Sequence, residues 1–306
     1  MLRSVILAAA GNERIKHLAV TAPVSRALVA RFVAGEAADD AVRVATSLAG
    51  AGLQVSLDRL GEDTTTRDQA TATAATYVEL LRRIADDGLA TSTEVSVKLS
   101  ALGQRIDQDL TLDNATAICA AADAGGTTVT LDMENHTTTD LTLDTLSLLR
   151  KDFPATGAVL QAYLRRTEGD CQELATAGSR VRLCKGAYAE PASVAYQRRD
   201  DVDRSYVRCV NILMAGAGRP MLATHDPRLV EIGAERASRY GRAPGSYELQ
   251  MLYGIRPDEQ KRLVAAGQTV RVYVPYGDQW YGYLMRRLAE RPANLGFFLR
   301  SVATRS

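Results

Sequence analysis

The chain has 306 residues, of which 46% are hydrophobic and 24% are charged, the composition of an ordinary soluble globular protein. Its 37 lysine and arginine residues nearly balance its 36 aspartate and glutamate residues, so no overall charge attracts nucleic acid. No apolar run approaches the roughly 20 residues that span a bilayer, and four cysteines without zinc-binding spacing indicate free thiols in a reducing cytoplasm.

The N-terminal region, residues 1–51, is predicted to form extra helices ahead of the first strand. Its apolar stretch at residues 5–10 is shorter than the roughly 7–15 residues of a signal-peptide core. A charged run at residues 13–16 follows at once. We therefore expect a short amphipathic helix there and no cleaved leader.

From residue 52 onward, short β-rich runs alternate with longer segments rich in Ala, Leu and Arg. The predicted strands are residues 53–57, 94–99, 127–131, 158–162, 180–183, 220–223, 246–251 and 270–274. The predicted helices are residues 67–86, 114–122, 142–150, 202–214, 228–240, 258–266 and 279–290. Such alternation is typical of βαβ units and a parallel sheet.

Eight strand–helix units favour closure into a barrel over an open, doubly wound sheet of that size. No GxGxxG follows the first strand, which leaves a dinucleotide-binding Rossmann fold without support. We therefore predict an α/β fold with one (β/α)8 TIM-barrel domain over residues 1–306. Residues 1–51 are its N-terminal helical region and residues 52–306 its barrel.

Polar residues follow most of the predicted strands, at the ends where barrels of this kind carry their active sites. They are Lys98, Asp132, Glu134, Gln161, Arg182, Lys185, Thr224, His225, Asp226, Glu248, Gln250, Tyr273 and Tyr276. A solvated rim would also be polar, but it would not embed charges inside the strands. This convergence predicts a polar site at the barrel mouth.

Lys98 lies between Val97 and Leu99, in a run that should be buried. An unpaired buried ammonium group is costly, so we expect a carboxylate partner. Asp132, after the next strand, is the natural partner. The pair is either a structural ion pair or part of a functional site.

Arg182 and Lys185 bracket a strand end that turns at Gly186. Two cations beside a glycine suit a phosphate or an electron-rich ring, although solvation at a helix end would explain the same pair. His225 is one of three histidines, and neither of the others has metal-ligand spacing with it. We therefore expect no metal site.

Arg286 and Arg287 are adjacent on the last predicted helix, residues 279–290. Adjacent helical residues do not share a face, so the plain interpretation is a solvated pair. If that helix lies across the barrel mouth, both guanidinium groups can hold one carboxylate.

Several segments resemble the proline dehydrogenase family. RLCKGAY at residues 182–188 is similar to the RLVKGAY signature of that family. Matches also occur, in order, in VKLSAL at 97–102, LDMENH at 131–136, LQAYLRR at 160–166, ATHD at 223–226 and YELQMLYGIR at 247–256. The most specific match is RVYVPYGDQWYGYLMRRLAERPAN at residues 271–294. Together the matches run from about the first strand to the end of the chain.

The resemblance implies a distorted (β/α)8 barrel with non-covalent FAD and a final helix over the mouth. It implies oxidation of L-proline to Δ1-pyrroline-5-carboxylate, by hydride transfer to flavin N5 and electron transfer to a membrane quinone. A cytoplasmic protein with peripheral contact at the inner face of the membrane fits that acceptor. Because the chain is too short for the aldehyde-oxidising domain of bifunctional relatives, we expect a separate pyrroline-5-carboxylate dehydrogenase downstream.

Carried over by motif, the resemblance assigns site residues. The expected catalytic residues are Asp132 and Arg182, with Arg182 near flavin N5. Proline is expected to contact Lys98, Tyr273, Tyr283, Arg286, Arg287 and Glu290. In this assignment the two adjacent arginines clamp the carboxylate and the glutamate holds them in place. FAD is expected to be lined by Met133, Gln161, Arg182, Lys185, Gly186, Ala187, Thr224 and His225.

Cys184 departs from the signature, which usually carries Val at that position. We expect its side chain either to point away from Arg182 and Lys185 by strand alternation or to sit at the frayed end of the strand. A buried packing role is favoured over a redox role.

Three other functions are compatible with the pattern. A Schiff-base lyase would also place a strand lysine, Lys98, in the mouth, and borohydride would trap its imine. Another flavin barrel, such as a folate reductase, would respond to NADH and folate. A non-catalytic binding module would bind a ligand tightly without turnover.

Overall fold

The computed structural model describes residues 29–61 and 64–290, with the side chains of residues 286–290 outside the described part. The amphipathic helix expected near the N-terminus falls on residues 1–28 and lies outside the described residues. So does the end of the most specific family-like segment, after residue 290.

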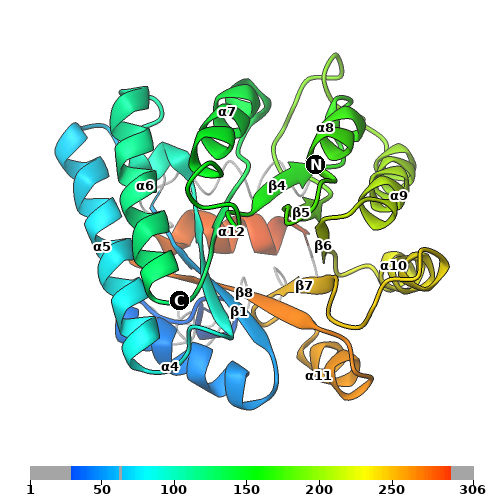
Figure 1. Ribbon diagram of the computed structural model, residues 1–306, viewed down its shortest axis with the longest axis horizontal. Coiled ribbons are helices and arrows are strands. Elements are labelled where there is room, and N and C mark those ends of the chain that lie inside the picture. Colours follow the sequence, from blue (N-terminus) through cyan, green and yellow to red (C-terminus); the bar gives the residue numbers. More distant parts are fainter. Residues whose placement is uncertain (1–28, 62–63, 291–306) are drawn as a thin grey trace, which may run out of the picture.

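Eight parallel strands form one sheet in the order β3-β2-β1-β8-β7-β6-β5-β4 (Figure 1). The strands are β1 Gln54–Arg59, β2 Thr93–Val97, β3 Val129–Leu131, β4 Ala158–Gln161, β5 Arg180–Cys184, β6 Arg219–Ala223, β7 Glu248–Leu252 and β8 Val270–Tyr276. All eight predicted strands are confirmed, with ends that shift by a few residues. The largest consequence is at β2, which ends at Val97, so Lys98 follows the strand instead of lying within it.

The barrel closes between β3 and β4 through a narrow contact. There Thr130 pairs with Gly157, one residue before β4 begins. Two backbone hydrogen bonds hold this contact, from Leu131 N to Gly157 O at 2.9 Å and from Gly157 N to Val129 O at 2.8 Å. The expected distorted (β/α)8 barrel is thus confirmed, and this seam is its weakest strand pairing.

The helices surround the sheet. They are α4 Ala38–Gly50, α5 Arg67–Asp86, α6 Gln108–Ala124, α7 Thr139–Leu149, α8 Thr167–Leu174, α9 Arg199–Ala215, α10 Pro227–Arg239, α11 Pro257–Ala265 and α12 Trp280–Glu290, with short 3-10 helices η1 Leu99–Leu102 and η2 His136–Thr138. Helix α5 has its predicted bounds because Thr66 caps it, its Oγ1 accepting from Gln69 N at 3.3 Å. Helix α8 was not predicted, since the sequence TEGDCQEL has no helical apolar period.

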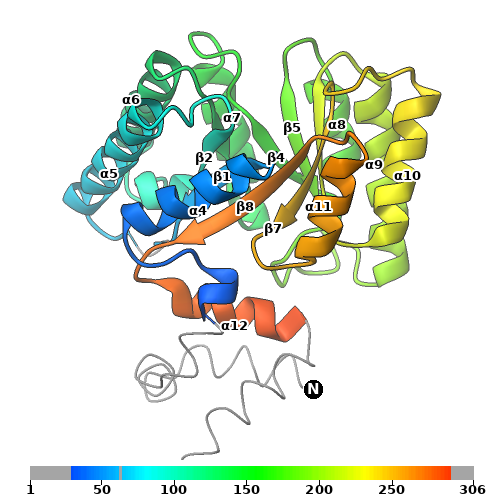
Figure 2. The ribbon, with the colours of Figure 1, turned by 90° about the horizontal axis from the view of Figure 1, so that it is seen from below.

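Two helices have unusual places. Helix α4 packs on the outside of β1 and β8 and buries Ala41, Val42 and Ala45 there. Helix α12, which follows β8, crosses the middle of the barrel in Figure 1 and lies beyond the strand tips in Figure 2. Helix α4 therefore occupies the wall position of an eighth barrel helix, and α12 covers the mouth as predicted.

Alternation along the strands separates two interiors. In β1, Val55 and Leu57 face outward into the hydrophobic core between sheet and helices, whereas Ser56 and Asp58 face inward. The same period puts apolar side chains outside and polar ones inside in β2, β7 and β8. The inside of this barrel is therefore polar, and that interior forms the site.

The seam between β3 and β4 predicts an effect of one substitution. A Cβ added at Gly157 would lie 2.6 Å from Thr130 Oγ1, so the seam would have to open. We expect Gly157→Ala to lower the free energy of unfolding by about 1–3 kcal/mol, the usual cost of overpacking. Urea unfolding followed by circular dichroism measures this change.

Gly169→Ala is the matched control, because a Cβ at this helical position meets no atom within 4 Å. It should leave stability unchanged or raise it by up to about 1 kcal/mol, since alanine favours a helix. Equal destabilisation by both substitutions would contradict the close contact at the seam.

Candidate active site at the barrel mouth

Polar side chains fill the inside of the barrel in a stack that rises toward the mouth. The lower part, here called the ionic layer, consists of Glu94, Arg180, Glu248 and Arg271. Above it lies Arg182, held among Ser56, Ser96 and Gln250. At the mouth lies a group here called the mouth cluster, consisting of Asp58, Lys98, Asp132 and Tyr273. Interactions between strands that are not neighbours in the sheet, such as Arg180 of β5 with Glu94 of β2, show that these side chains meet inside the barrel.

The mouth cluster is built around Lys98. Its Nζ lies 2.8 Å from both carboxylate oxygens of Asp58 and 3.6 Å from Asp132 Oδ2. Tyr273 donates a hydrogen bond from its hydroxyl to Asp132 Oδ2 at 2.7 Å. The predicted pairing of Lys98 with Asp132 is present, but Asp58 is the nearer carboxylate.

Asp58 was missed because the first strand was predicted to end at residue 57. The strand continues to Arg59, so Asp58 is an inward-facing strand residue two positions beyond Ser56. A strand extended by one residue in the prediction would have placed a carboxylate beside Lys98.

Burial sets the protonation of this cluster. It raises the pKa of the Asp58 carboxyl, with Lys98 opposing the shift and Asp132 adding to it. Burial also raises the pKa of the Tyr273 hydroxyl well above its ordinary value, and the charge of Asp132 adds to that shift. Tyr273 therefore stays protonated at neutral pH and serves as a hydrogen-bond donor.

Arg182 links the mouth cluster to the layer below. Its five N–H donors reach side-chain oxygens of Ser56, Glu94, Ser96, Asp132 and Gln250, at distances from 2.6 to 3.3 Å. Its guanidinium carbon also lies 5.3 Å from the centre of the Tyr273 ring. The guanidinium group is thereby fixed in one orientation, and only 4% of this residue is exposed.

The ionic layer holds charges where barrels of this type usually pack branched apolar side chains. Glu94 contacts Arg180 Nη2 and lies 3.3 Å from Arg182 Nη2 and 3.8 Å from Arg271 Nε. Glu248 accepts from Arg271 Nε at 2.7 Å. Together with the mouth cluster and Arg182, the stack contains four carboxylates and four cations, so these buried charges balance.

The arginines keep the two lower carboxylates ionised. Burial alone would raise the pKa of Glu94, but Arg180, Arg271 and Arg182 hold it well below its ordinary value. For Glu248, burial likewise opposes ionisation, and Arg271 lowers the pKa below its ordinary value. Both carboxylates therefore carry their charge at neutral pH.

On the rim above β5, Lys185 is held by two acidic side chains. Its Nζ lies 2.6 Å from Asp203 Oδ1 and 3.5 Å from Asp226 Oδ2. Gly186 has a positive φ of 108°, and an added Cβ would lie 2.2 Å from the ring of Tyr163. The predicted turn at Gly186 is confirmed, and only glycine fits it.

His225 links the end of β6 to the end of β7 by a hydrogen bond. Its Nε2 accepts from Leu252 N at 2.9 Å, which places a proton on Nδ1 in the neutral ring. Asp226 caps helix α10 through a hydrogen bond from Arg228 N at 3.1 Å. The Arg228 side chain bonded to Asp226 lowers the pKa of that carboxyl to about 2.

The ends of β3 and β4 are joined by Glu134 and Gln161. Glu134 accepts hydrogen bonds from Ser100 N at 3.1 Å and Ser100 Oγ at 2.7 Å. Gln161 Nε2 donates to the carbonyl oxygen of Glu134 at 2.7 Å. Met133 is buried beside them. These residues make the part of the rim that adjoins the seam.

Cys184 is the last residue of β5, so it sits at the end of the strand, one of the two places predicted for it. The other predicted place, turned away from Arg182 by alternation, does not follow, because residues two apart on a strand share a face. Its thiol lies 3.6 Å from the Leu160 carbonyl oxygen. Burial raises the pKa of the thiol to about 11, with Arg182 opposing, so it is not a reactive thiolate at neutral pH.

The structure thus brings most of the predicted site residues to one end of the barrel. Asp132 contacts Lys98, Arg182 and Tyr273, and the Arg182 guanidinium also lies over the Tyr273 ring. The residues Met133, Gln161, Lys185, Gly186, Ala187, Thr224 and His225 follow the ends of β3 to β6 or lie at those ends. Tyr283 is buried on α12. Arg286, Arg287 and Glu290 belong to α12, but their side chains lie outside the described residues.

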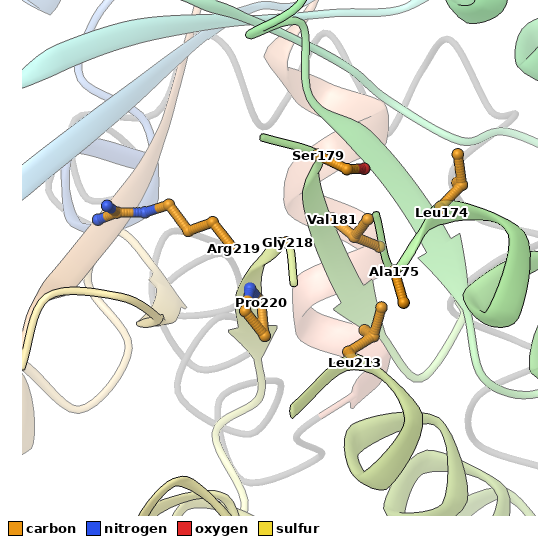
Figure 3. A pocket seen from close by; sticks show the side chains of 8 residues that line it. All are labelled: Leu174, Ala175, Ser179, Val181, Leu213, Gly218, Arg219 and Pro220. Carbon is orange, nitrogen blue, oxygen red and sulfur yellow. The ribbon is translucent and has the colours of Figure 1, made fainter. Parts of the chain in front are cut away.

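A small hollow lies at the opposite end of the barrel. Figure 3 shows a hollow at the start of β5 and β6, lined by Leu174, Ala175, Ser179, Val181, Leu213, Gly218, Arg219 and Pro220, with no room for a water molecule.

Within residues 29–61 and 64–290, no group of three or more His, Cys, Asp or Glu residues is arranged to hold a metal ion. No helix of that same part is long and apolar enough to cross a membrane.

Comparison with known proteins gives consistent matches. A sequence profile of the family described as proline dehydrogenase matches residues 41–300. The proline dehydrogenase of Deinococcus radiodurans is 38% identical over 307 residues, covering 99% of this chain and 98% of that protein. Proline dehydrogenase 2 of Bacillus subtilis strain 168 is 36% identical over 278 residues, 91% of each chain.

Solved structures share the fold. Proline utilization A from Bdellovibrio bacteriovorus, inactivated by N-propargylglycine, matches with a TM-score of 0.80 at 26% identity. A mutant of Bradyrhizobium japonicum proline utilization A matches with a TM-score of 0.74 at 23% identity. The matches cover 88% and 92% of this chain but only 33% and 32% of those longer chains. This chain therefore corresponds to about a third of each of those structures.

The geometry of the mouth cluster predicts which carboxylate depends on Lys98. Lys98→Met removes the ammonium group that both oxygens of Asp58 contact, and breaking a buried ion pair costs about 3–5 kcal/mol. Adding Asp58→Asn to this variant should restore more stability than adding Asp132→Asn, because Asp132 keeps Arg182 and Tyr273 as partners. Urea unfolding of the three variants measures these differences. Greater recovery with Asp132→Asn would show that Asp132 is the main partner.

Proposed function

The chain belongs to the proline dehydrogenase family, and on that premise we propose that it oxidises L-proline to Δ1-pyrroline-5-carboxylate with bound FAD as the hydride acceptor. One observation carries the proposal: Lys98, Asp132, Arg182 and Tyr273 form one connected, largely buried group at the barrel mouth that α12 covers, and the glycine turn at Gly186 follows the end of β5. Cations and an aromatic ring beside a close-approach glycine suit an anionic substrate and a flavin.

The rim residues fit an FAD molecule. Gly186 has no side chain at a turn where any Cβ would strike Tyr163, which allows the backbone a close approach to a ligand. The ammonium group of Lys185, the residue before this turn, is held in place by Asp203 and Asp226. A cation at this position suits the phosphates of FAD. We propose that Met133, Gln161, Ala187, Thr224 and His225 complete this binding surface. When bound, FAD supplies a two-electron acceptor at its N5 atom.

Proline would bind between the mouth cluster and helix α12. Arg286 and Arg287 are carried over as the clamp for its carboxylate, with Glu290 as their support and Lys98 as a third cation. Tyr273 and Tyr283 would pack against the ring. Contacts to the carboxylate supply binding energy away from the reacting carbon, and that energy orients the C–H bond beside the nitrogen.

The charges of the mouth also act on the substrate amine. An amine must be neutral before the adjacent carbon releases a hydride, and nearby cations disfavour its protonated form. Lys98 and Arg182 provide two such cations, both held in place by carboxylates. Asp132 fixes them relative to each other, since it contacts both side chains. We propose this as the role of Asp132.

The position of Lys98 argues against a Schiff-base lyase. A lysine that attacks a carbonyl must first lose its proton. Both oxygens of Asp58 lie 2.8 Å from Lys98 Nζ, and this contact stabilises the charged ammonium form. The same lysine is well suited to bind a carboxylate.

We further propose a membrane quinone as the electron acceptor, reached by peripheral contact of a cytoplasmic protein with the membrane. The product would pass to a separate pyrroline-5-carboxylate dehydrogenase. Both parts of the proposal follow from the family resemblance and are independent of the mouth geometry.

Anaerobic addition of L-proline to the purified, FAD-loaded protein tests the reaction. We expect the visible flavin spectrum to bleach and a quinone analogue to restore it. A flavin that stays oxidised with proline but bleaches with NADH and regains colour with folate would support a folate reductase. A protein that takes up no FAD and is trapped by borohydride with a carbonyl substrate would support the lyase.

The carboxylate clamp predicts a change in proline binding. Arg286→Ala removes one charge-assisted contact worth about 1.5–3 kcal/mol, so the apparent KM for proline should rise by about 10- to 100-fold. Steady-state kinetics with a quinone analogue measures it. Arg43→Ala is the control, because Arg43 lies exposed on α4 and pairs only with the side chain of Asp40 among the described residues. An unchanged KM in Arg286→Ala would remove this arginine from the substrate site.

A further inference from the structure

The ionic layer is in direct contact with Arg182 through one side chain, Glu94. Its Oε1 accepts from Arg182 Nη2 at 3.3 Å, and its Oε2 contacts Arg180 Nη2. The exposed fraction of Glu94 is 1%, so water screens neither contact. A change of charge at Glu94 or Arg180 therefore reaches Arg182 with little attenuation.

Fold stability alone does not account for these charges. Buried ion pairs are weak contributors to stability, and apolar residues of similar volume commonly replace them without loss. In this barrel the pair lies directly below the arginine that joins the mouth cluster, and neither Glu94 nor Arg180 contacts the mouth cluster itself in the described interactions. Their position suits an electrostatic role exerted through Arg182.

We propose that the Glu94–Arg180 pair tunes the reduction potential of the flavin at the barrel mouth. The pair does so by holding Arg182 in place and by setting the net charge around it. Both are positioning residues, since neither touches substrate or cofactor. This inference rests on the proposed binding of FAD beside Arg182. It goes beyond that proposal, because it assigns a function to a layer that the reaction itself does not use.

The sign of the effect follows from charge. Reduction of bound FAD by two electrons and one proton adds one negative charge to the flavin. Positive charge nearby therefore favours the reduced form, and negative charge favours the oxidised form. Glu94→Gln removes a negative charge and should raise the potential, whereas Arg180→Gln removes a positive charge and should lower it. The double variant restores the balance and should lie near the wild type.

Each single substitution should change the equilibrium constant for reduction by about tenfold, which is about 30 mV for a two-electron couple. A titration of the FAD-loaded protein with dithionite and mediator dyes, without proline, measures the potential directly. This readout does not depend on turnover. A purely structural role would not shift the two single variants in opposite directions.

Thr128→Val is the matched control. Thr128 Oγ1 accepts from Arg180 Nη1 at 2.9 Å and donates to Glu94 Oε2 at 3.2 Å. Valine removes both hydrogen bonds without any change of charge. An unchanged potential in this variant, together with opposite shifts in the two charge variants, would support the inference.

Several results would overturn it. They are shifts of both charge variants in the same direction, no shift in either, or a shift of similar size in Thr128→Val. If a charge variant does not fold, Arg219→Gln decides the question. Its side chain is 37% exposed and lies 3.3 Å from Glu248 of the same layer, so its loss should lower the potential. A raised or unchanged potential in Arg219→Gln would overturn this inference but not the proposed function. A wild-type protein that takes up no FAD would overturn both.

Discussion

Burial of ionised side chains inside the barrel is the constraint on which the rest of this structure depends. Charges removed from water require partners with good geometry, or they destabilise the fold by several kcal/mol each. Here Glu94, Asp58 and Asp132 each contact at least one cation, and Arg182 has an oxygen for every donor. That mutual satisfaction fixes the orientation of the residues proposed to meet substrate and flavin. The site is therefore preorganised by its own charge balance, as an electrostatic catalyst requires.

The arrangement of helices α4 and α12 leads to the same end. Helix α4 packs on β1 and β8, which covers the barrel wall that the helix after β8 would otherwise cover. Helix α12 is thereby available to lie over the strand tips (Figure 2). A hydrogen bond from Trp280 Nε1 to Glu36 Oε1 at 3.1 Å links it to the N-terminal part of the described chain. A helix in that place brings the Arg286 and Arg287 backbone to the mouth. The N-terminal region thus contributes to the site although it carries none of the proposed site residues.

Much of this could be predicted from the sequence, since local patterns report local structure. The alternation of β-rich and Ala-rich runs gave all eight strands, and Lys98 embedded between apolar residues indicated a buried ion pair. Asp58, the nearer partner of Lys98, was not predicted, because the end of a strand is uncertain by a residue or two. The two residues are also 40 positions apart in the sequence and meet only because β1 pairs with β2. The ionic layer was also missed as a unit, since Glu94 and Arg180 meet only after eight strands close into a barrel. Long-range charge pairing has no local signature.

The central claim is that this barrel mouth holds a flavin and proline next to the cluster of Lys98, Asp132 and Arg182. A crystal structure of the FAD-loaded protein with a proline analogue that cannot be oxidised tests it most directly. The account predicts the flavin ring between the ends of β4 to β6 and helix α12, with N5 beside Arg182 and the analogue carboxylate on Arg286 and Arg287. A flavin bound elsewhere on the molecule, or an analogue carboxylate that contacts neither arginine, would contradict it.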